Sequence, residues 1–364
     1  MPIPAMRDLG EARRTIAAWL AAQRPEWEQL EIGEPHGPGG TGFSNETLIF
    51  DATWSEAGQR RTRGLVARVE PTTYRVFLEA DFENQYRVIR ALGDRTEVKV
   101  PPVIGFEPDP AVMGAPFFVM TKVAGVAPAD APPYNEQGFL VELTPAQRER
   151  LWLSALDQLV AIHRVDYRQL GLEFLSKPAR GPSGMEQQLA YYDEAFVWAA
   201  EDRPQPVAEA AWAWLQAHVP AERPTELSWG DSRIGNMLFH EGECRAVLDW
   251  EMVSLGGREM DLGWWLFLDR FHTEGYGLAR LPGMGGRDDT IAEWERRTGL
   301  RARNLAFYEV FAGFRFAVVM IRLARLYMQW ELPVPPDMET NNPVTQVLAR
   351  ILDLAPPGVP APSP

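Results

Sequence analysis

The sequence predicts an α+β fold of two lobes, with a small N-terminal lobe built on a β-sheet and a larger, mainly helical C-terminal lobe. Three observations support this: 364 residues are too many for one ordinary core, strand-like apolar runs come early, and long helical periodicities follow. We place the first lobe at residues 1–122, a connector rich in Ala and Pro at 123–133, and the second lobe at 134–355. The Pro-rich tail, 356–364, is expected to be disordered.

The first lobe should begin with a helix, because Asp8 can cap a segment whose Ile16, Trp19 and Leu20 lie at helical spacing. A glycine-rich stretch then leads into a hairpin, since polar residues separate two strand-like runs. The expected elements are a helix at 8–23, strands at 47–54 and 65–69, a helix at 77–92, and strands at 103–106 and 116–121.

The second lobe should open with a long helix, in which Thr144 is the cap and Pro145 the first helical residue. Further segments with apolar residues at helical spacing flank an irregular stretch that contains a short hairpin. The expected elements are helices at 144–165, 185–200, 206–217, 259–270, 289–298 and 304–330, with the hairpin inside 227–250.

The formal net charge of -14, without a run of Lys or Arg, argues against a nucleic-acid-binding protein. This acidic balance can attract a cationic substrate, or it can simply keep the protein soluble. The single cysteine, Cys244, excludes an internal disulfide and argues against a cysteine-based zinc site. The N-terminus lacks the pattern of a signal peptide, and no apolar run reaches the length of a membrane span, so we expect a cytoplasmic protein without a membrane partner.

The strongest chemical signal is the run WGDSRIGN at 229–236, in which Asp231 precedes Asn236 by five positions. Asp249 follows at the end of the apolar run AVL, thirteen residues after Asn236. Phosphoryl transfer to a hydroxyl uses one Asp to accept the hydroxyl proton, and an Asn and a second Asp to hold Mg²⁺. The alternative makes Asp231 and Asn236 turn residues and Asp249 a cap at the strand end. All three in this order favour the catalytic interpretation.

A glycine-rich stretch, GPGGTGFSN at 37–45, comes directly before an expected strand. Glycines let backbone amides approach phosphate oxygens, and Ser and Asn side chains can add donors. The stretch lacks the ending of a P-loop, and its G-x-G-x-x-G spacing precedes a strand rather than the helix of a dinucleotide-binding fold. A strand follows the glycine-rich loop of kinases, and a plain flexible loop is the alternative. The candidate phosphate-binding residues are Gly40, Gly42, Phe43, Ser44 and Asn45.

Arg68, in the run LVAR, takes the place of the Lys in a V-A-I-K strand. A cation on this strand can contact nucleotide phosphates and pair with a carboxylate on the following helix. Glu83 is the first candidate for that carboxylate and Glu79 the second, although Gln85 occupies one plausible position for it. The alternative is a surface arginine whose stem covers apolar neighbours.

Two other polar residues invite a structural interpretation. Asp261 opens an aromatic-rich helix, which it can cap while it also braces the loop around Asp231. His163, in the run IHRVD, could be a general base, but we expect a packed histidine at a helix end. Cys244 is expected to be structural.

Five runs in this order resemble the aminoglycoside phosphotransferase and choline kinase-like superfamily: GFSNETLIF, LVAR, LVAIHRVDYRQLGL, WGDSRIGNMLF and LDWEMVSLGGREMDLGWWL. Bacterial phosphotransferase family proteins and the kinase-like domain fused to some acyl-CoA dehydrogenases are the most similar. The resemblance implies a protein-kinase-like fold with ATP in the cleft between the lobes. The sequence departs from it at Trp229, where the family usually has His, and at Arg68, where it usually has Lys.

By this resemblance Asp231 is the catalytic base, Asn236 and Asp249 hold Mg²⁺, and Arg68 contacts phosphate. The connector would give adenine its backbone hydrogen bonds. The residues concerned are Met120, Thr121, Lys122 and Val123.

The sequence thus predicts a phosphotransferase that uses ATP and Mg²⁺ to phosphorylate a hydroxyl or amine of a small molecule; the oligomeric state stays open. A nucleotide-binding pseudokinase without turnover is the alternative, against which Asp231, Asn236 and Asp249 argue. Aromatic residues of the second lobe favour an acceptor with an apolar part over a common aminoglycoside. These residues are Tyr191, Tyr192, Phe196, Trp198, Trp264, Trp265, Phe314, Phe316 and Trp330, and further candidates for the acceptor pocket are Glu251, Asp269 and Tyr308.

Overall fold

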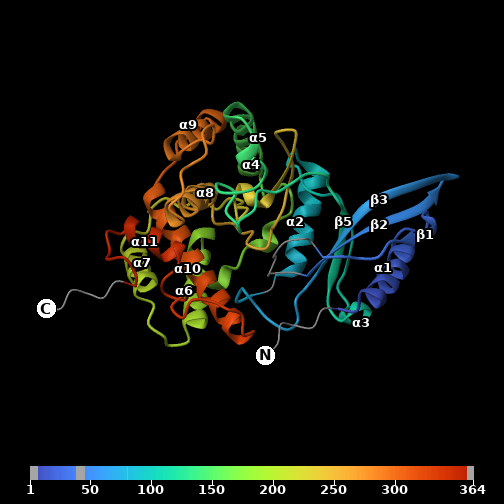
Figure 1. Ribbon diagram of the computed structural model, residues 1–364, viewed down its shortest axis with the longest axis horizontal. Coiled ribbons are helices and arrows are strands. Elements are labelled where there is room, and N and C mark those ends of the chain that lie inside the picture. The colour runs from blue at the N-terminus through green and yellow to red at the C-terminus, as the bar shows by residue number, and fades with distance from the viewer. Residues whose placement is uncertain (1–6, 38–45, 80, 359–364) are drawn as a thin grey trace.

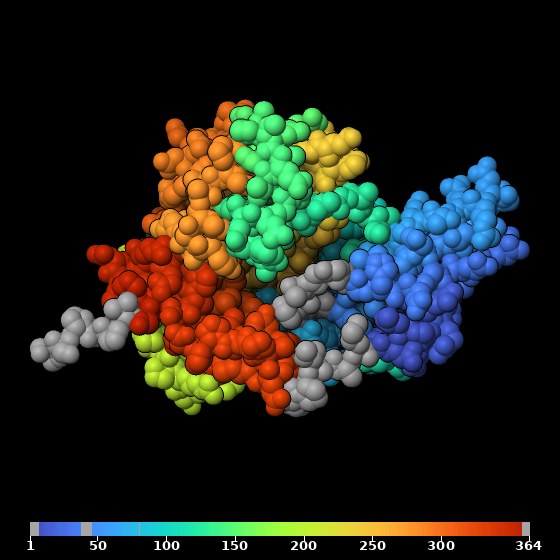
Figure 2. All heavy atoms as spheres, in the orientation of Figure 1, coloured from blue at the N-terminus to red at the C-terminus, as the bar shows by residue number. Residues whose placement is uncertain are grey.

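The computed structural model describes residues 7–37, 46–79 and 81–358 and has two lobes (Figure 1). The first lobe contains an antiparallel sheet of five strands in the order β1-β2-β3-β5-β4. Figure 2 shows this lobe as the smaller body, projecting to one side of the helical lobe. The two-lobed α+β prediction is confirmed. The elements of the first lobe are α1 (Leu9–Gln23), β1 (Glu28–Ile32), β2 (Glu46–Glu56), β3 (Gln59–Val69), α2 (Phe82–Arg95), β4 (Val103–Glu107), α3 (Pro110–Met113) and β5 (Phe117–Thr121).

The hairpin of β2 and β3 positions Arg68. Its turn consists of Ala57 and Gly58, whose φ angles of 49° and 75° suit a two-residue hairpin turn. Its register sets Thr47 opposite Arg68. Side chains alternate along a strand, and Val66 belongs to the core that α2 shares with the second lobe. Arg68 therefore shares the sheet face that is turned toward the second lobe.

The segment between β3 and α2 differs from the prediction, because the helix expected at 77–92 begins only at Phe82. Residues 70–79 instead form an irregular strap, part of which packs on α10. The ring of Tyr74 meets that of Trp330 edge-on, with centroids 5.1 Å apart. Arg322 donates to the carbonyl of Arg75 at 3.1 Å. These contacts with the second lobe hold the strap in a conformation that is not helical.

The second lobe is mainly helical, with a two-stranded sheet of β6 and β7. Thr144 caps α5 as predicted, and Gln147 completes a capping box. None of the helices in the described part of the chain is long and apolar enough to cross a membrane. The main elements are α4 (Phe139–Glu142), α5 (Pro145–His163), α6 (Gly184–Ala200), α7 (Pro206–Ala217), β6 (Met237–His240), β7 (Glu243–Val247), α8 (Arg258–Arg270), α9 (Arg287–Thr298), α10 (Leu305–Gln329) and α11 (Pro343–Ile351).

The crossing of α8 and α10 sets the position of the side chains described below. A Cβ on Gly263 would lie 2.6 Å from the backbone of Tyr308, so glycine is needed for this close approach. Most residues of α8 are buried. Asp261 and Trp264, both on α8, are therefore held in a rigid part of the lobe.

Candidate active site

Asp261 organises the loop that carries Asp231. Its side chain is fully buried and accepts hydrogen bonds from the Ser228 hydroxyl at 2.6 Å, the Trp229 amide at 2.7 Å and the Gly230 amide at 2.8 Å. Gly257, not Asp261, occupies the cap of α8, so the capping part of the prediction is wrong. The bracing part agrees with the structure.

His163 is one more partner of Asp261. The Trp294 indole donates to His163 Nδ1 at 2.9 Å, which leaves Nε2 to donate to Asp261 Oδ2 at 3.2 Å. Both hydrogen bonds can form with a neutral imidazole. His163 is buried, as expected of a packed helix-end residue.

Trp229, which stands where the resemblance has His, ties the loop to the segment of Asp249. Its indole N–H lies 2.9 Å from the carbonyl of Leu248 and 3.1 Å from that of Asp249. Asp249 has a φ of 54°, in the left-handed region. A non-glycine residue there costs of order 1–3 kcal/mol unless its surroundings hold it. Trp229 contributes to that hold through these two hydrogen bonds.

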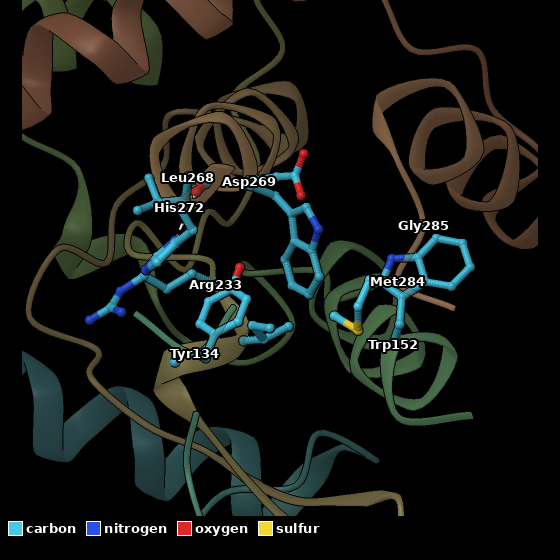
Figure 3. Close-up of a pocket in the computed structure, with 11 residues that line it drawn as sticks. Tyr134, Trp152, Arg233, Leu268, Asp269, His272, Met284 and Gly285 are labelled. Carbon is cyan, nitrogen blue, oxygen red and sulfur yellow. Dashed lines mark hydrogen bonds between the residues drawn. The ribbon is translucent and has the colours of Figure 1, made fainter. Parts of the chain in front are cut away.

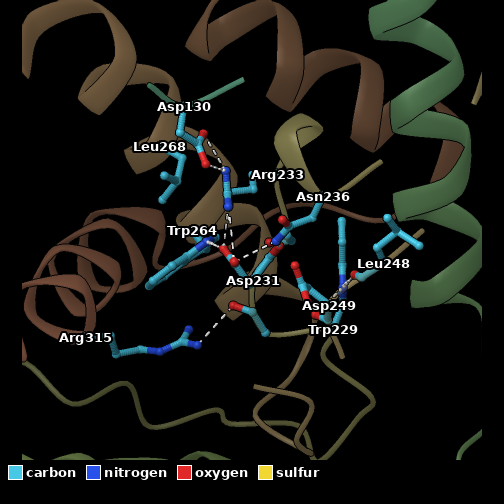
Figure 4. Close-up of polar contacts among 12 residues, drawn as sticks. Asp130, Trp229, Asp231, Arg233, Asn236, Leu248, Asp249, Trp264, Leu268 and Arg315 are labelled. Atoms are coloured by element: carbon cyan, nitrogen blue, oxygen red, sulfur yellow. Dashed lines mark hydrogen bonds and ion pairs between the residues drawn. The ribbon is translucent and has the colours of Figure 1, made fainter. Parts of the chain in front are cut away.

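The carboxylate of Asp231 accepts hydrogen bonds from three side chains (Figure 4). Trp264 Nε1 lies 2.7 Å from Oδ1, and Asn236 Nδ2 lies 2.6 Å from Oδ2. Arg233 Nε bridges both oxygens at 3.1 and 3.2 Å. Each oxygen thus receives two contacts, which use the roughly four lone-pair positions of a carboxylate, so an incoming hydroxyl would have to displace or share the bridging N–H of Arg233.

Asn236 and Asp249 present oxygen atoms that suit a hard cation. Asn236 donates to Asp231 only through Nδ2, so its amide oxygen takes part in neither bond. Within 7–37, 46–79 and 81–358, no group of three or more His, Cys, Asp or Glu side chains gathers as a metal site. Two protein ligands fit Mg²⁺ only if phosphate oxygens and water complete the octahedron, which is how this ion usually binds beside nucleotides.

Arg68 reaches this site from the other lobe. Its Nη2 lies 3.1 Å from Asp249 Oδ1, and its Nη1 lies 3.3 Å from the Thr47 hydroxyl. The predicted pairing with Glu83 or Glu79 is wrong for this structure. Glu83 is exposed at the start of α2, and Glu79 pairs with Arg180 at 2.7 Å. Neither carboxylate is therefore available to Arg68, although α2 packs on the same face of the sheet, and Arg68 pairs with Asp249 instead.

The residues predicted to bind the nucleotide lie in the glycine-rich stretch and at the end of β5. Gly40, Gly42, Phe43, Ser44 and Asn45 lie outside the described residues. Met120 and Thr121 end β5, and Lys122 and Val123 follow it. The amides of Thr121 and Lys122 donate to Pro102 and Gly64 in the sheet, so their N–H groups are already used. This makes Val123 the best candidate for an adenine contact among these four connector residues.

The model of the phosphotransferase enzyme family matches residues 46–300, more than half of the chain. The chain belongs to this family. A Ralstonia eutropha protein assigned by name to the aminoglycoside phosphotransferases has a TM-score of 0.67 and 23% identity, with 93% of this chain and 98% of that chain covered. The phosphotransferase APH(4)-Ia in complex with ADP and hygromycin B has a TM-score of 0.57 and 14% identity, with the same coverage. These likenesses establish a shared fold.

The sequence relatives of this phosphotransferase are longer proteins. Arabidopsis thaliana IBR3, described as a probable acyl-CoA dehydrogenase, is 28% identical over 310 residues, which cover 80% of this chain and 36% of the relative. Acyl-CoA dehydrogenase family member 10 of Mus musculus is 28% identical over 273 residues, covering 71% of this chain and 24% of the relative. The chain thus spans about a third or less of these two relatives.

A cavity of about 350 Å³ opens beside Asp231 in this phosphotransferase. Its walls are mostly apolar and come from α8, α10, the strap and the connector. Of the predicted aromatic residues only Trp264 and Phe316 line it, and of the three further candidates only Glu251 does. The lining residues are Val76, Phe77, Asp130, Ala131, Asp231, Arg233, Asp249, Glu251, Met252, Trp264, Leu268, Phe271, Tyr276, Phe316, Val319, Met320, Leu323, Tyr327 and Met338.

A much smaller cavity, of about 20 Å³, lies behind the same loop (Figure 3). It has room for about one water molecule. Asp269 lines this cavity and pairs with Arg280. Tyr308 is buried on the other side of α8, against Gly263. Asp269 and Tyr308 are therefore not part of the large cavity, contrary to the prediction.

Asp130, from the connector, joins the site through Arg233. The Arg233 Nη1 lies 2.6 Å from both Asp130 oxygens. His272 lies within 3.0 Å of Asp130 through Nε2 and within 2.8 Å of the Leu268 carbonyl through Nδ1, so both ring nitrogens face acceptors. Burial opposes ionisation, but the charge of Arg233 and the hydrogen bond from His272 outweigh it and hold the pKa of Asp130 below its usual range.

Arg233 and Asp130 were not predicted to belong to the site, and Trp264 was expected only as an aromatic residue of the acceptor pocket, not as a donor to Asp231. Arg233 had a usable signal, since it lies two positions after Asp231. Trp264 lies three positions after Asp261 on the same helix, so a helical model of α8 would have placed it one turn further along. Asp130 had no local signal, because its contact with Arg233 spans 103 positions.

Proposed function

We propose that this chain is an ATP- and Mg²⁺-dependent phosphotransferase that moves the γ-phosphoryl group to a hydroxyl, or an amine, of a small molecule. One observation carries the proposal: the carboxylate of Asp231 lies on the wall of a large cavity that Asp249 also lines. The same carboxylate accepts a hydrogen bond from Asn236 (Figure 4). A base beside two oxygen ligands is the arrangement that kinase-type transfer needs.

In this proposal Asp231 orients the acceptor hydroxyl and takes its proton as the new O–P bond forms and the bond to the departing ADP oxygen breaks. Asn236 and Asp249 would hold Mg²⁺, which neutralises the phosphate charge when it is bound. Arg68 would move from Asp249 to the nucleotide phosphates, since its guanidinium is a forked donor for either anion. Val123 would contact adenine.

The lining of the cavity supports an acceptor that has an apolar part. Solved neighbours bind aminoglycosides, namely hygromycin B in APH(4)-Ia and kanamycin in APH(2")-IIIa. Polycationic rings call for several accessible carboxylates. Here Asp130 and Asp231 both pair with Arg233, and most of the wall consists of aliphatic and aromatic side chains. Desolvating such rings against this wall would be unfavourable.

A nucleotide-binding protein without turnover is the second candidate. The contact between Arg68 and Asp249 favours it, because this ion pair occupies a carboxylate oxygen that Mg²⁺ would need. The pair is partly exposed, with 18% and 31% of the two side chains accessible. Partly exposed ion pairs are weak, typically below about 1 kcal/mol. Mg²⁺ and ATP phosphates can therefore displace it.

The test is ADP release with ATP and Mg²⁺ over four acceptor groups: aminoglycosides, sugars, amino alcohols and aliphatic alcohols of increasing chain length. The proposal expects acceptor-dependent ADP release, strongest with alcohols that carry an apolar chain. Efficient turnover of kanamycin, with kcat/KM above about 10⁴ M⁻¹s⁻¹, would contradict the proposed acceptor class. ATP binding without acceptor-dependent release across the panel would support the second candidate.

A further inference from the structure

Arg315, on α10, is a buried cation without a carboxylate partner among the described residues. It is 0% exposed, and its one hydrogen bond runs from Nη2 to the carbonyl of Gly230 at 3.0 Å. Within the described part of the chain, its Nε and Nη1 have no hydrogen-bond partner. Burying a charge in this way is costly, and a buried apolar residue of similar size would usually be at least as stable. The residue therefore needs an explanation other than stability.

Aromatic rings compensate part of that cost. The Arg315 guanidinium carbon lies 4.6 Å from the ring centre of Trp264, 5.1 Å from that of Tyr192 and 5.7 Å from that of Phe311. The negative face of an aromatic ring attracts a cation, most strongly for Trp. The nearest of the three rings is the one that donates to Asp231.

Trp264 connects this cation to Asp231 (Figure 4). The Arg315 guanidinium lies over the face of the Trp264 ring, and the indole N–H of Trp264 donates a hydrogen bond to Asp231 Oδ1 at 2.7 Å. Arg315 also holds the carbonyl of Gly230, the residue before Asp231. Gly230 has a φ of 98°, and a Cβ there would lie 2.1 Å from the Met252 carbonyl, so this backbone position is tightly constrained. The backbone and the side chain of the base are thus held by one pair of residues.

We propose that Trp264 and Arg315 form a positioning pair that fixes the orientation of the Asp231 carboxylate. A cation over the indole face withdraws electron density and strengthens the N–H as a donor to an anion. Because Trp264 also lines the cavity, it aligns the base with the wall against which the acceptor packs. The kinetic part of this inference rests on the proposed function, whereas the hydrogen bond can be tested without turnover.

The first experiment observes the indole N–H groups of the full chain by ¹H–¹⁵N correlation spectroscopy. Trp264→Phe identifies one resonance by its loss, and the control Trp265→Phe removes a different one. We expect the Trp264 resonance to lie downfield and to move upfield in Asp231→Asn and in Arg315→Met. A Trp264 resonance that is unmoved in both variants overturns the inference, whether or not any acceptor is turned over.

The second experiment measures kinetics with the best alcohol of the panel. Trp264→Phe should lower kcat by about tenfold to hundredfold with the KM for ATP unchanged. Arg315→Lys should retain more activity than Arg315→Met, since it keeps the cation. A Trp264→Phe enzyme with the same kcat as Trp265→Phe, or an Arg315→Lys enzyme no more active than Arg315→Met, would rule out a positioning role.

Discussion

Asp231 receives donors from three different side chains, and this arrangement decides what a substitution there should do. Trp264 comes from α8, while Arg233 and Asn236 belong to the loop itself. An amide in place of the carboxylate keeps the shape of the side chain and one acceptor oxygen. The surrounding loop remains braced by Asp261, which does not depend on the Asp231 side chain.

Asp231→Asn is therefore expected to reduce turnover by roughly two to four orders of magnitude, the range of a general base. ATP binding and the melting temperature should change little. ADP release and the thermal shift produced by ATP measure the two effects separately. Asp288→Asn, at a side chain that is 96% exposed, is the matched control. Near-normal turnover in Asp231→Asn would remove it from the mechanism.

Asp249→Ala should abolish the part of ATP binding that depends on Mg²⁺. A ligand at 100 times its dissociation constant stabilises a protein by about 2.7 kcal/mol, which a melting experiment resolves easily. We expect ATP with Mg²⁺ to protect the parent protein and Asp288→Ala, but to protect Asp249→Ala no better than ATP with a chelator. Equal protection of all three proteins would show that Asp249 is not a metal ligand.

Local spacing was enough to mark Asp231, Asn236 and Asp249 as a set, because all three lie within one loop and hairpin. The ion pair of Arg68 with Asp249 joins residues 181 positions apart, so no local sequence pattern could predict it. A periodic pattern tells which face of a strand is buried, but not which carboxylate lies opposite that face. The partner of Arg68 was predicted wrongly for this reason.

Among the elements, the strap is the part that sequence patterns described least well. Only its last residues, 77–79, were predicted, and they were assigned to the helix expected at 77–92. In the structure Phe77 lines the cavity instead, and Glu79 pairs with Arg180. Shorter elements were also missed. They include β1, whose Glu28 and Glu31 dilute its strand character, and α11, although Asn342 and Pro343 supply cap and first-turn signals.

Phe77→Ala should raise the KM for an apolar acceptor severalfold and leave the KM for ATP unchanged. Its ring lies on the cavity wall, and removing it takes away apolar contact area from the acceptor alone. Tyr74→Ala is the control, because Tyr74 lies on the same strap but packs on Trp330 outside the cavity. If both substitutions raise the KM equally, loosening of the strap explains the effect and Phe77 does not contact the acceptor.

For the molecule as a whole, the connector is tied to the helical lobe by the contacts of Asp130 with Arg233 and His272. The pKa of Asp130 is lower in the folded protein than its ordinary value of 3.8. A depressed carboxyl pKa contributes stability that is complete above the unfolded pKa and is lost as the pH falls below it. The contact should therefore stabilise the protein at neutral pH and progressively less in acid.

Asp130→Asn should accordingly lower the melting temperature most near neutral pH, and the difference from the parent should shrink as the pH falls below about 4. Melting curves at a series of pH values measure this directly. Asp288→Asn should show a small difference that does not depend on pH in the same way. A difference for Asp130→Asn that stays constant into acid would mean that its ionisation does not stabilise the fold.

The strap has a consequence for how this site can change over evolutionary time. The loop around Asp231 is closely packed, so most substitutions there endanger the chemistry itself. The strap contributes Val76 and Phe77 to the same cavity but belongs to the other lobe and carries none of the proposed catalytic groups. Variation in a few strap residues can therefore select new substrates while the reaction is preserved. Within a set of homologues, sequence divergence in the strap should therefore accompany a change of acceptor substrate.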